Sequence, residues 1–289
     1  MVAFGTREDV PLPGLTFSSG STRYLAFFRQ RTGEWKWVPT TGGTTTTKTL
    51  GGPGSVPVPA LYDNDALTDL AVYNPGTADF KLMRSQTNWV GTITRSFGSV
   101  YVPQVGGTAG QRSGAIPLSG VTRQEWICVG SGSTQFCHNE PRHAFTLFYP
   151  NEGIWTTMWD PANSSGIDKC IFGNGATDIP LPGIRLNLDL YTDMVVYRGE
   201  SGSTPGYFSF KNSTPSMPNV CNGSSQTLTF AGLNQPRLRV FAVSDMTGDG
   251  KPEIMIVHPE IMRIEWLTSE SAFSTSVFRD IGNHRAIVL

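Results

Sequence analysis

The densest group of potentially reactive side chains lies between residues 121 and 143. It contains two cysteines and two histidines, Cys128, Cys137, His138 and His143. Thiolate and imidazole groups are the ligand types of tetrahedral Zn²⁺ sites, but this spacing matches no familiar zinc pattern. The two cysteines flank a short glycine-containing turn, so we expect a disulfide-stapled hairpin, with a zinc site as the alternative.

The same segment carries further groups that suit ligand binding. Trp126 and Arg142 accompany His138 and His143 in a loop that elaborates the repeated framework described below. Elaborated loops on rigid scaffolds often carry binding functions. We therefore predict that these four side chains contribute to a ligand-binding surface.

The chain has four cysteines, Cys128, Cys137, Cys170 and Cys221. An even number in a β-rich, Gly- and Ser/Thr-rich sequence favours an oxidising compartment. Of the three pairings that four cysteines allow, we favour Cys128 with Cys137 and Cys170 with Cys221. Four buried free thiols are the alternative.

The elements that must position these residues recur along the chain. A hydrophobic-Pro-hydrophobic-Pro segment follows a Phe-Gly or Leu-Gly step, and its clearest copies lie at residues 10–14, 56–60 and 179–183. Looser copies start at Ile116 and Leu238. A period of roughly 45 to 65 residues indicates supersecondary units that cannot bury their apolar faces alone.

The first unit predicts four strands, at Val10–Gly14, Tyr24–Arg29, Glu34–Val38 and Lys48–Leu50. The third of these alternates with period two, as expected of a strand with one buried face. The other units repeat the pattern at 56–60, 69–73, 79–82 and 92–97; at 116–118, 145–149, 154–158 and 169–172; at 179–182, 193–197, 206–210 and 226–230; and at 238–243, 253–257, 262–266 and 273–278.

Four-stranded antiparallel meanders of this size are typical of β-propeller blades. We predict an all-β propeller that forms one domain over residues 1–289. Its five blades would span residues 10–55, 56–115, 116–178, 179–237 and 238–282, with 1–5 and 285–289 as closing or extra strands. A fragment of a six- or seven-bladed ring is the alternative.

The repeat resembles the FG-GAP/VCBS-type repeat of integrin-alpha-like and bacterial lectin-like propellers. The matching segments are Phe4–Gly14 with Leu25–Trp35, Val56–Ala60 with Asp69–Tyr73, and Asp178–Gly183 with Asp193–Arg198. The resemblance covers nearly the whole chain and implies a β-propeller. It implies no single function, because this repeat serves adhesion proteins, lectin-like domains and enzyme accessory domains.

In that family the loop between the first and second strands binds Ca²⁺ through Asp-x-Asp-x-Asp-Gly-x-x-Asp. The segment from Asp245 to Glu253 keeps this form. The resemblance implies side-chain oxygen ligands from Asp245, Asp249 and Glu253. Thr247 would supply its hydroxyl or a water, and Lys251 its carbonyl. Thr247 removes one negative charge, which weakens affinity, so we expect one structural Ca²⁺.

The corresponding loops of the other units have lost ligands. The second unit keeps Asp63, Asp65 and Asp69 but has Leu61 in place of the leading Asp, and the first, at residues 16–21, has no carboxylate. The fourth also lacks a clear first ligand. We expect these loops to be metal-free and held by turn hydrogen bonds.

Five tryptophans lie at or near the predicted third strands, namely Trp35, Trp37, Trp155, Trp159 and Trp266. A tryptophan at a repeated position usually packs in the core. Trp37 and Trp159 fit the repeat least well, so we predict that these two can stack on a sugar ring beside polar groups.

Composition limits the partners. Only 16% of residues are charged and the net charge is −1, which gives no electrostatic footprint for nucleic acid or an anionic membrane. No apolar run reaches membrane-spanning length. Met1 leads directly into repeat material, from which we expect a mature domain or an excised fragment.

We predict a secreted or cell-surface, non-enzymatic module that binds glycans or another surface protein. One alternative is a structural domain that assembles into a larger surface protein, array or fibre. The other is a five-bladed glycoside hydrolase with carboxylates in an axial cleft. The sequence contains no G-x-S-x-G, HExxH or phosphate-cradling motif, and the Val-Pro-Leu-Pro strands carry no acids, which argues against an enzyme.

Overall fold

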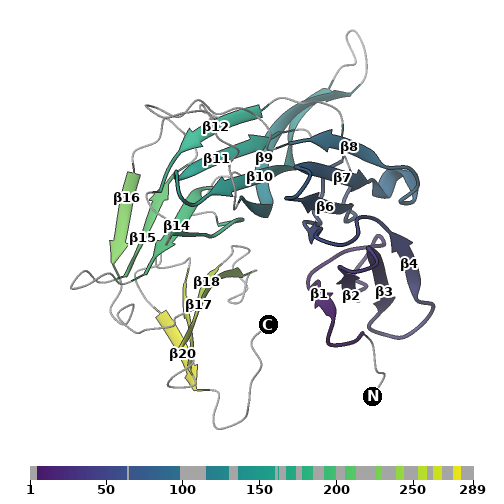
Figure 1. Ribbon diagram of the computed structural model, residues 1–289, viewed down its shortest axis with the longest axis horizontal. Coiled ribbons are helices and arrows are strands. Elements are labelled where there is room, and N and C mark those ends of the chain that lie inside the picture. The colour runs from purple at the N-terminus through teal and green to yellow at the C-terminus, as the bar shows by residue number, and fades with distance from the viewer. Residues whose placement is uncertain are drawn as a thin grey trace. The chain divides into compact units, whose positions relative to one another are not determined.

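The protein is built from β-strands, as the computed structural model in Figure 1 shows. The structure describes residues 5–63, 65–97, 115–129, 136–159, 162, 167–173, 178–184, 192–199, 206–212, 225–229, 239–243, 253–258, 263–268 and 276–280. Within these ranges it has twenty strands, and its one helical element is a 3-10 turn, η1 (Ser85–Thr87). None of the described residues forms a helix long and apolar enough to cross a membrane.

The strands form five four-stranded sheets, each in chain order. The first contains β1 (Asp9–Pro11), β2 (Tyr24–Arg29), β3 (Glu34–Pro39) and β4 (Thr46–Thr49). The second contains β5 (Val56–Pro57), β6 (Leu70–Asn74), β7 (Asp79–Met83) and β8 (Ile93–Ser96). The third contains β9 (Ile116–Val129), β10 (Phe136–Tyr149), β11 (Ile154–Met158) and β12 (Ile167–Ile171).

The fourth sheet contains β13 (Asp178–Pro180), β14 (Met194–Arg198), β15 (Tyr207–Lys211) and β16 (Ser225–Thr229). The fifth contains β17 (Arg239–Val243), β18 (Glu253–His258), β19 (Arg263–Leu267) and β20 (Ser276–Asp280). All five predicted meanders are therefore present, and the all-β fold class is confirmed.

The chain divides into two compact units. The first comprises residues 1–120, 142–149 and 156–168, and the second comprises residues 121–141, 150–155 and 169–289. A buried cluster of the first unit includes Leu12, Phe28, Trp35, Leu50, Leu70 and Val72. A buried cluster of the second includes Leu181, Ile184, Val195, Phe208, Ile254 and Ile256. Each unit thus has an apolar core of its own.

The Leu50–Gly51 step after the first sheet belongs to a set of contacts that ties the end of β4 to the turn between β2 and β3. We call this set of contacts the closure. Gly33, in the turn between β2 and β3, has a φ of +69°, and its carbonyl accepts a 2.8 Å hydrogen bond from the Leu50 amide. The Leu50 carbonyl in turn accepts a 3.1 Å hydrogen bond from Nε1 of the buried Trp35. A Cβ on Gly33 would lie 2.6 Å from the Gly51 carbonyl oxygen, so only glycine fits at residue 33.

The third sheet makes the same closure with different residues. The Phe172 amide donates to the Gly153 carbonyl at 2.7 Å, and Nε1 of Trp155 donates to the Phe172 carbonyl at 2.8 Å. In the second sheet Ala78 stands at the glycine position, with a φ of +55°, and accepts a 2.6 Å hydrogen bond from the Phe97 amide. The framework is therefore a repeated set of contacts as well as a repeated sequence.

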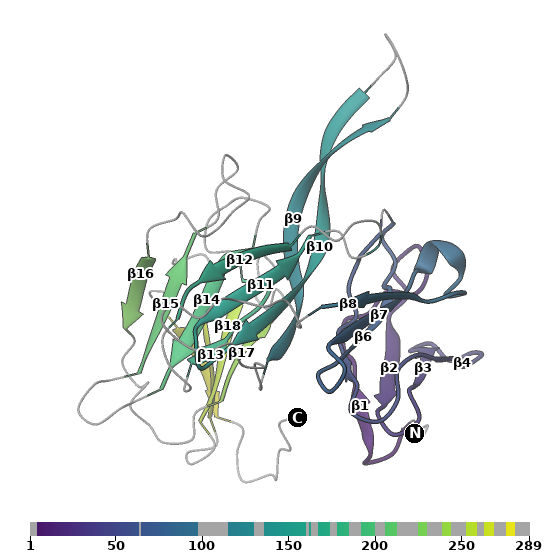
Figure 2. The same cartoon turned by 45° about the horizontal axis from the view of Figure 1, so that its top comes forward.

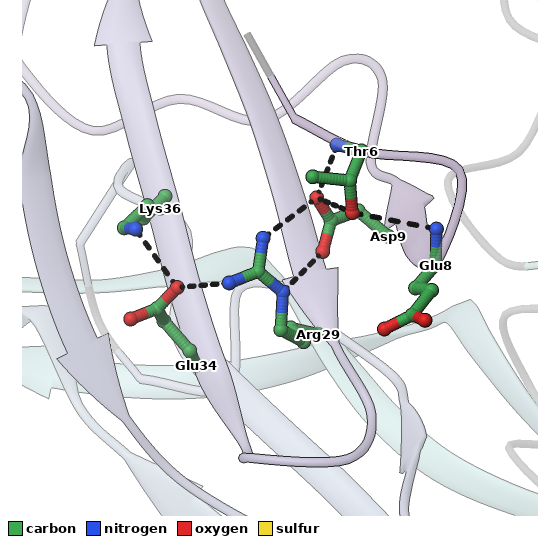
Figure 3. Close-up of polar contacts among 6 residues, drawn as sticks. All are labelled: Thr6, Glu8, Asp9, Arg29, Glu34 and Lys36. Atoms are coloured by element: carbon green, nitrogen blue, oxygen red, sulfur yellow. Dashed lines mark hydrogen bonds and ion pairs between the residues drawn. The ribbon is translucent and has the colours of Figure 1, made fainter.

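Figure 3 shows a charged network on the first sheet. Arg29 binds both carboxylate oxygens of Asp9, at 2.8 and 3.0 Å, and also contacts Glu34, which pairs with Lys36. Burial alone would raise the pKa of Asp9, but hydrogen bonds from Arg29 and Thr6 outweigh it and lower that pKa. These contacts tie β1 to β2 and β3.

The third sheet departs from the sequence prediction. Residues 116–118 and 145–149 are parts of two 14-residue strands, β9 and β10, so most of the predicted loop at 121–143 is strand. Figure 2 shows the two strands continuing side by side. β9 and β10 are neighbours in the third sheet, so the two arms of the expected hairpin extend the sheet strands themselves. Its turn, at residues 130–135, lies outside the described residues. β-Branched and aromatic residues around Trp126 favour this extension.

Candidate functional site

A surface cavity of about 500 Å³ lies within the first unit, between the first sheet and the turn that follows β7. Figures 1 and 2 both show that turn, the coiled ribbon between β7 and β8, on the side of β4. The lining residues are Phe17, Tyr24, Trp37, Pro39, Thr44, Thr46, Lys48, Asn88, Trp89 and Val90. Four aromatic rings thus stand beside hydroxyl, amide and ammonium groups, in a cavity of the size that binds small ligands.

The four rings form one packed cluster. Phe17 and Trp37 stack with their ring centroids 4.3 Å apart, and both are buried. Trp89 meets them edge-on, at 5.3 Å from Trp37 and 5.9 Å from Phe17, and Tyr24 meets Phe17 edge-on at 5.5 Å. Since Trp89 and Tyr24 are partly exposed, the stacked pair makes the base of the cavity and the other two rings face its opening.

The turn that carries Trp89 is held in an unusual backbone conformation. Asn88 and Trp89 have φ values of +57° and +53°, in the left-handed region that bulky residues rarely adopt. The Trp89 amide donates to the Arg84 carbonyl at 2.9 Å, and its Nε1 donates to the Thr68 carbonyl at 3.0 Å. Backbone strain of this kind persists only where surrounding contacts impose it, and it often occurs at functional sites.

The two sheets that flank the cavity are joined directly. The Thr68 amide donates to the Thr16 carbonyl at 2.7 Å, and the Thr16 amide donates to the Thr68 hydroxyl at 2.9 Å. Nζ of Lys48, on β4, donates to the Asn88 carbonyl at 2.9 Å. The cavity is therefore formed before any ligand arrives.

The acidic loop of the second sheet has a different character. Asp69 is fully buried and accepts backbone hydrogen bonds from Tyr62, Asp63 and Ser85, at 2.7, 3.0 and 2.6 Å. The Ser85 hydroxyl lies 2.8 Å from both carboxylate oxygens of Asp65, 3.0 Å from Asp69 and 3.4 Å from Asp63. The expected turn hydrogen bonds are present within the loop, from the Asp65 amide to Asp63 at 3.1 Å and from the Leu67 amide to Asp65 at 2.8 Å. In addition, the three carboxylates converge on one hydroxyl group.

This crowding affects the protonation of the loop. Burial, reinforced by the charge of Asp63, raises the pKa of Asp69 to about 7, and burial also raises the pKa of Asp63. One hydroxyl proton can satisfy only one of the three carboxylates. Among the described residues, no group of three or more His, Cys, Asp or Glu side chains is arranged to hold a metal ion.

The tryptophans predicted from sequence separate into two environments. Trp37 lies in the aromatic cavity, whereas Nε1 of Trp159 donates to Asp168 and Trp159 is not among the lining residues. Trp35 and Trp155 are buried framework residues, as expected. Trp89 is a cavity residue that the sequence does not predict; its one sequence signal is that it lies outside the repeat period, in a polar turn.

Several predicted site residues cannot be placed. The calcium-loop residues Asp245, Thr247, Asp249 and Lys251 lie outside the described residues. Glu253 is described and is buried at the start of β18. The side chains of Trp126, His138 and Arg142, on β9 and β10, also lie outside the description. The His143 amide donates to the Leu61 carbonyl at 3.1 Å.

The cysteines are described in part. Cys170 is buried and disulfide-bonded, and the described part of the chain contains no free cysteine. Cys221 and the side chains of Cys128 and Cys137 lie outside the described residues. The two pairings therefore stay predictions.

No protein-family model matches the sequence, and no curated protein matches it. Virginiamycin B lyase from Staphylococcus aureus is similar in structure, with a TM-score of 0.45 and 10% identity over 94% of this chain and 84% of that chain. BBS1N in complex with ARL6DN is similar with a TM-score of 0.41 and 11% identity, over 93% of this chain and 80% of that chain. Both structures are β-propellers. The FG-GAP/VCBS resemblance stays a prediction.

Proposed function

We propose that this protein is a non-enzymatic glycan-binding module and that the aromatic cavity of the first unit is its sugar site. The observation that carries the proposal is one cavity in which four aromatic rings stand beside threonine, asparagine and lysine side chains. Aromatic faces pack against the C–H face of a sugar ring, and the neighbouring polar groups bind its hydroxyls. Trp89 and Tyr24 are both partly exposed, and Trp89 offers the larger ring for this contact.

The rigidity of the cavity supports the proposal. Trp89 is fixed by hydrogen bonds from its amide and its indole nitrogen, to Arg84 and Thr68, and by edge contacts with two buried rings. A site that is already ordered loses little conformational entropy when ligand binds. This matters for sugars, whose individual contacts are weak.

The chemistry of the lining favours binding over hydrolysis at this cavity. Glycoside hydrolysis ordinarily needs a pair of carboxyl groups that flank the scissile bond. The ten lining residues include no Asp or Glu. The hydrolase alternative therefore receives no support from this cavity.

The location and the calcium ion are part of the same proposal. A disulfide at Cys170 supports an oxidising, extracellular setting. A structural Ca²⁺ at residues 245–253 would be held by Asp245, Asp249 and Glu253, with Thr247 and Lys251 completing the loop. It would neutralise the carboxylates there. Chelation is expected to lower the thermal unfolding midpoint and to leave sugar binding by the first unit intact.

The test measures binding of a panel of neutral and acidic mono- and oligosaccharides. Tryptophan fluorescence and saturation-transfer NMR report the binding. Trp89→Ala is expected to abolish binding, and Trp159→Ala, a tryptophan outside the cavity, to leave it unchanged. Trp89→Phe keeps a stacking ring and provides a second variant if the alanine variant unfolds. Absence of binding to every sugar, or equal binding by wild type and both Trp89 variants, would overturn the proposal.

A further inference from the structure

Lys48 is the one charged side chain among the ten residues that line the aromatic cavity. Its ammonium group donates a 2.9 Å hydrogen bond to the Asn88 carbonyl, which fixes its position at the wall. It forms no ion pair with any residue in the described part of the chain. An ammonium group has three donors, so its charge and two of its N–H groups are left for another partner.

The other cations described on the first sheet behave differently. Arg29 pairs with Asp9 and Glu34, and Lys36 pairs with Glu34 at 2.9 Å. Arg198 in the fourth sheet likewise binds Asp178, at 2.6 Å. Of the three cations on the strands of the first sheet, Lys48 is therefore the one without a carboxylate partner among the described residues, and it stands where a ligand cavity opens.

We propose that the cavity selects an anionic sugar, one that bears a carboxylate or sulfate group, with Lys48 as its counter-charge. This inference rests on the proposed sugar-binding function of the same cavity. The rings would contact the apolar face of the sugar, and the Lys48 ammonium would bind the acidic group. A hydrogen bond between an ammonium and an anionic group is stronger than one between neutral groups.

The first test uses the unmodified protein and matched probes. Glucuronate and galacturonate are compared with their uncharged methyl esters, with glucose and galactose, and with the corresponding sugar sulfates. Acidic sugars are expected to bind about tenfold more tightly than the esters, as one charge-assisted hydrogen bond allows. The difference should shrink at high ionic strength, because salt screens the interaction.

The second test compares two substitutions that remove the same charge. Lys48→Met is expected to reduce the preference for acid over ester to near unity while keeping the binding of neutral sugar. Lys81→Met, on β7 and outside the cavity, should leave that preference unchanged. Thermal unfolding of both variants establishes that they fold. If Lys48→Met does not fold, the comparison of acids with esters on the wild-type protein tests the anionic preference instead.

The outcomes separate the two proposals. Equal binding of acid, ester and neutral sugar overturns the anionic preference and leaves the sugar site standing. An acid preference that survives Lys48→Met places the counter-charge elsewhere and also overturns the inference. Binding of none of these probes, nor of the wider panel, overturns the sugar site itself.

Discussion

The loops that precede the second strands of the first and second sheets are equivalent in position and opposite in character. Phe28 and Tyr73 each pair with the valine of a Val-Pro step in the first strand of their sheet, so Tyr24 is the counterpart of Asp69. In the second sheet this loop turns its carboxylates inward around the Ser85 hydroxyl. In the first sheet it contributes aromatic rings to a cavity.

The neighbouring strand shows the same divergence. Trp37, in the base of the cavity, occupies the place that Leu82 fills in the second sheet, and both are buried. The closure through Gly33 and Trp35 is nonetheless retained in the first sheet. Contacts that recur between sheets therefore stabilise each sheet, and contacts that occur only once are the better guide to function.

The largest expected effect tests the recurring closure. Gly33→Ala places a Cβ 2.6 Å from the Gly51 carbonyl oxygen at a φ of +69°. We expect the free energy of unfolding to fall by about 3 to 4 kcal/mol, since both a steric clash and an unfavourable φ are imposed. Gly14→Ala is the matched control: its φ is +76° and its Cβ would meet nothing within 4 Å, so only about 1 kcal/mol is lost. Equal losses of unfolding free energy for Gly33→Ala and Gly14→Ala in denaturant titrations would contradict a steric requirement for glycine at residue 33.

The next prediction concerns the acidic loop. Asp69 titrates near 3.8 when unfolded, and burial raises its pKa to about 7 in the folded protein. Between these values the folded state keeps a proton that the unfolded state has lost. The contribution of Asp69 to stability is therefore greatest below pH 4 and falls as pH rises to 7, by up to about 1.4 kcal/mol per pH unit.

Asp69→Asn is expected to flatten this part of the pH profile, as measured by denaturant titrations from pH 4 to 7. Tyr24→Phe, the change at the equivalent place in the first sheet, should leave the slope as it is. An identical slope in wild type and Asp69→Asn would show that the two loops do not differ in protonation.

The sequence predicts the sheets well and the site only in part. Tyr24–Arg29 and Ile154–Met158 are strands with the predicted bounds, because apolar residues and turn glycines mark them. Trp37, which is buried in the base of the cavity, is predicted as a ligand-binding candidate from its poor fit to the repeat. Trp89 is not, because its place depends on two left-handed residues and on a hydrogen bond to Thr68, a contact with no local sequence pattern.

A third prediction contrasts two tryptophans two residues apart on β3. Trp35→Phe removes the donor to the buried Leu50 carbonyl and leaves a void, so we expect a loss of about 2 to 3 kcal/mol in unfolding free energy. Trp37→Phe keeps a ring in the stack and should cost about 1 kcal/mol while weakening sugar binding. A larger loss of stability in Trp37→Phe than in Trp35→Phe, or unchanged sugar binding by Trp37→Phe, would contradict the assignment of Trp35 to the framework and Trp37 to the site.

The substitution with the smallest expected effect tests whether the second sheet has the same closure, although Ala78 stands there in place of the glycine. Ala78 holds a φ of +55° where the other two closures have Gly33 and Gly153. Ala78→Gly removes the left-handed penalty of about 1 to 2 kcal/mol and adds an entropic cost of up to about 1 kcal/mol, so we expect a net gain near 0.5 kcal/mol. Ala66→Gly, in the acidic loop and without a positive φ, should instead destabilise slightly. If both substitutions destabilise to the same extent in denaturant titrations, the Phe97 to Ala78 hydrogen bond is no counterpart of the glycine closure.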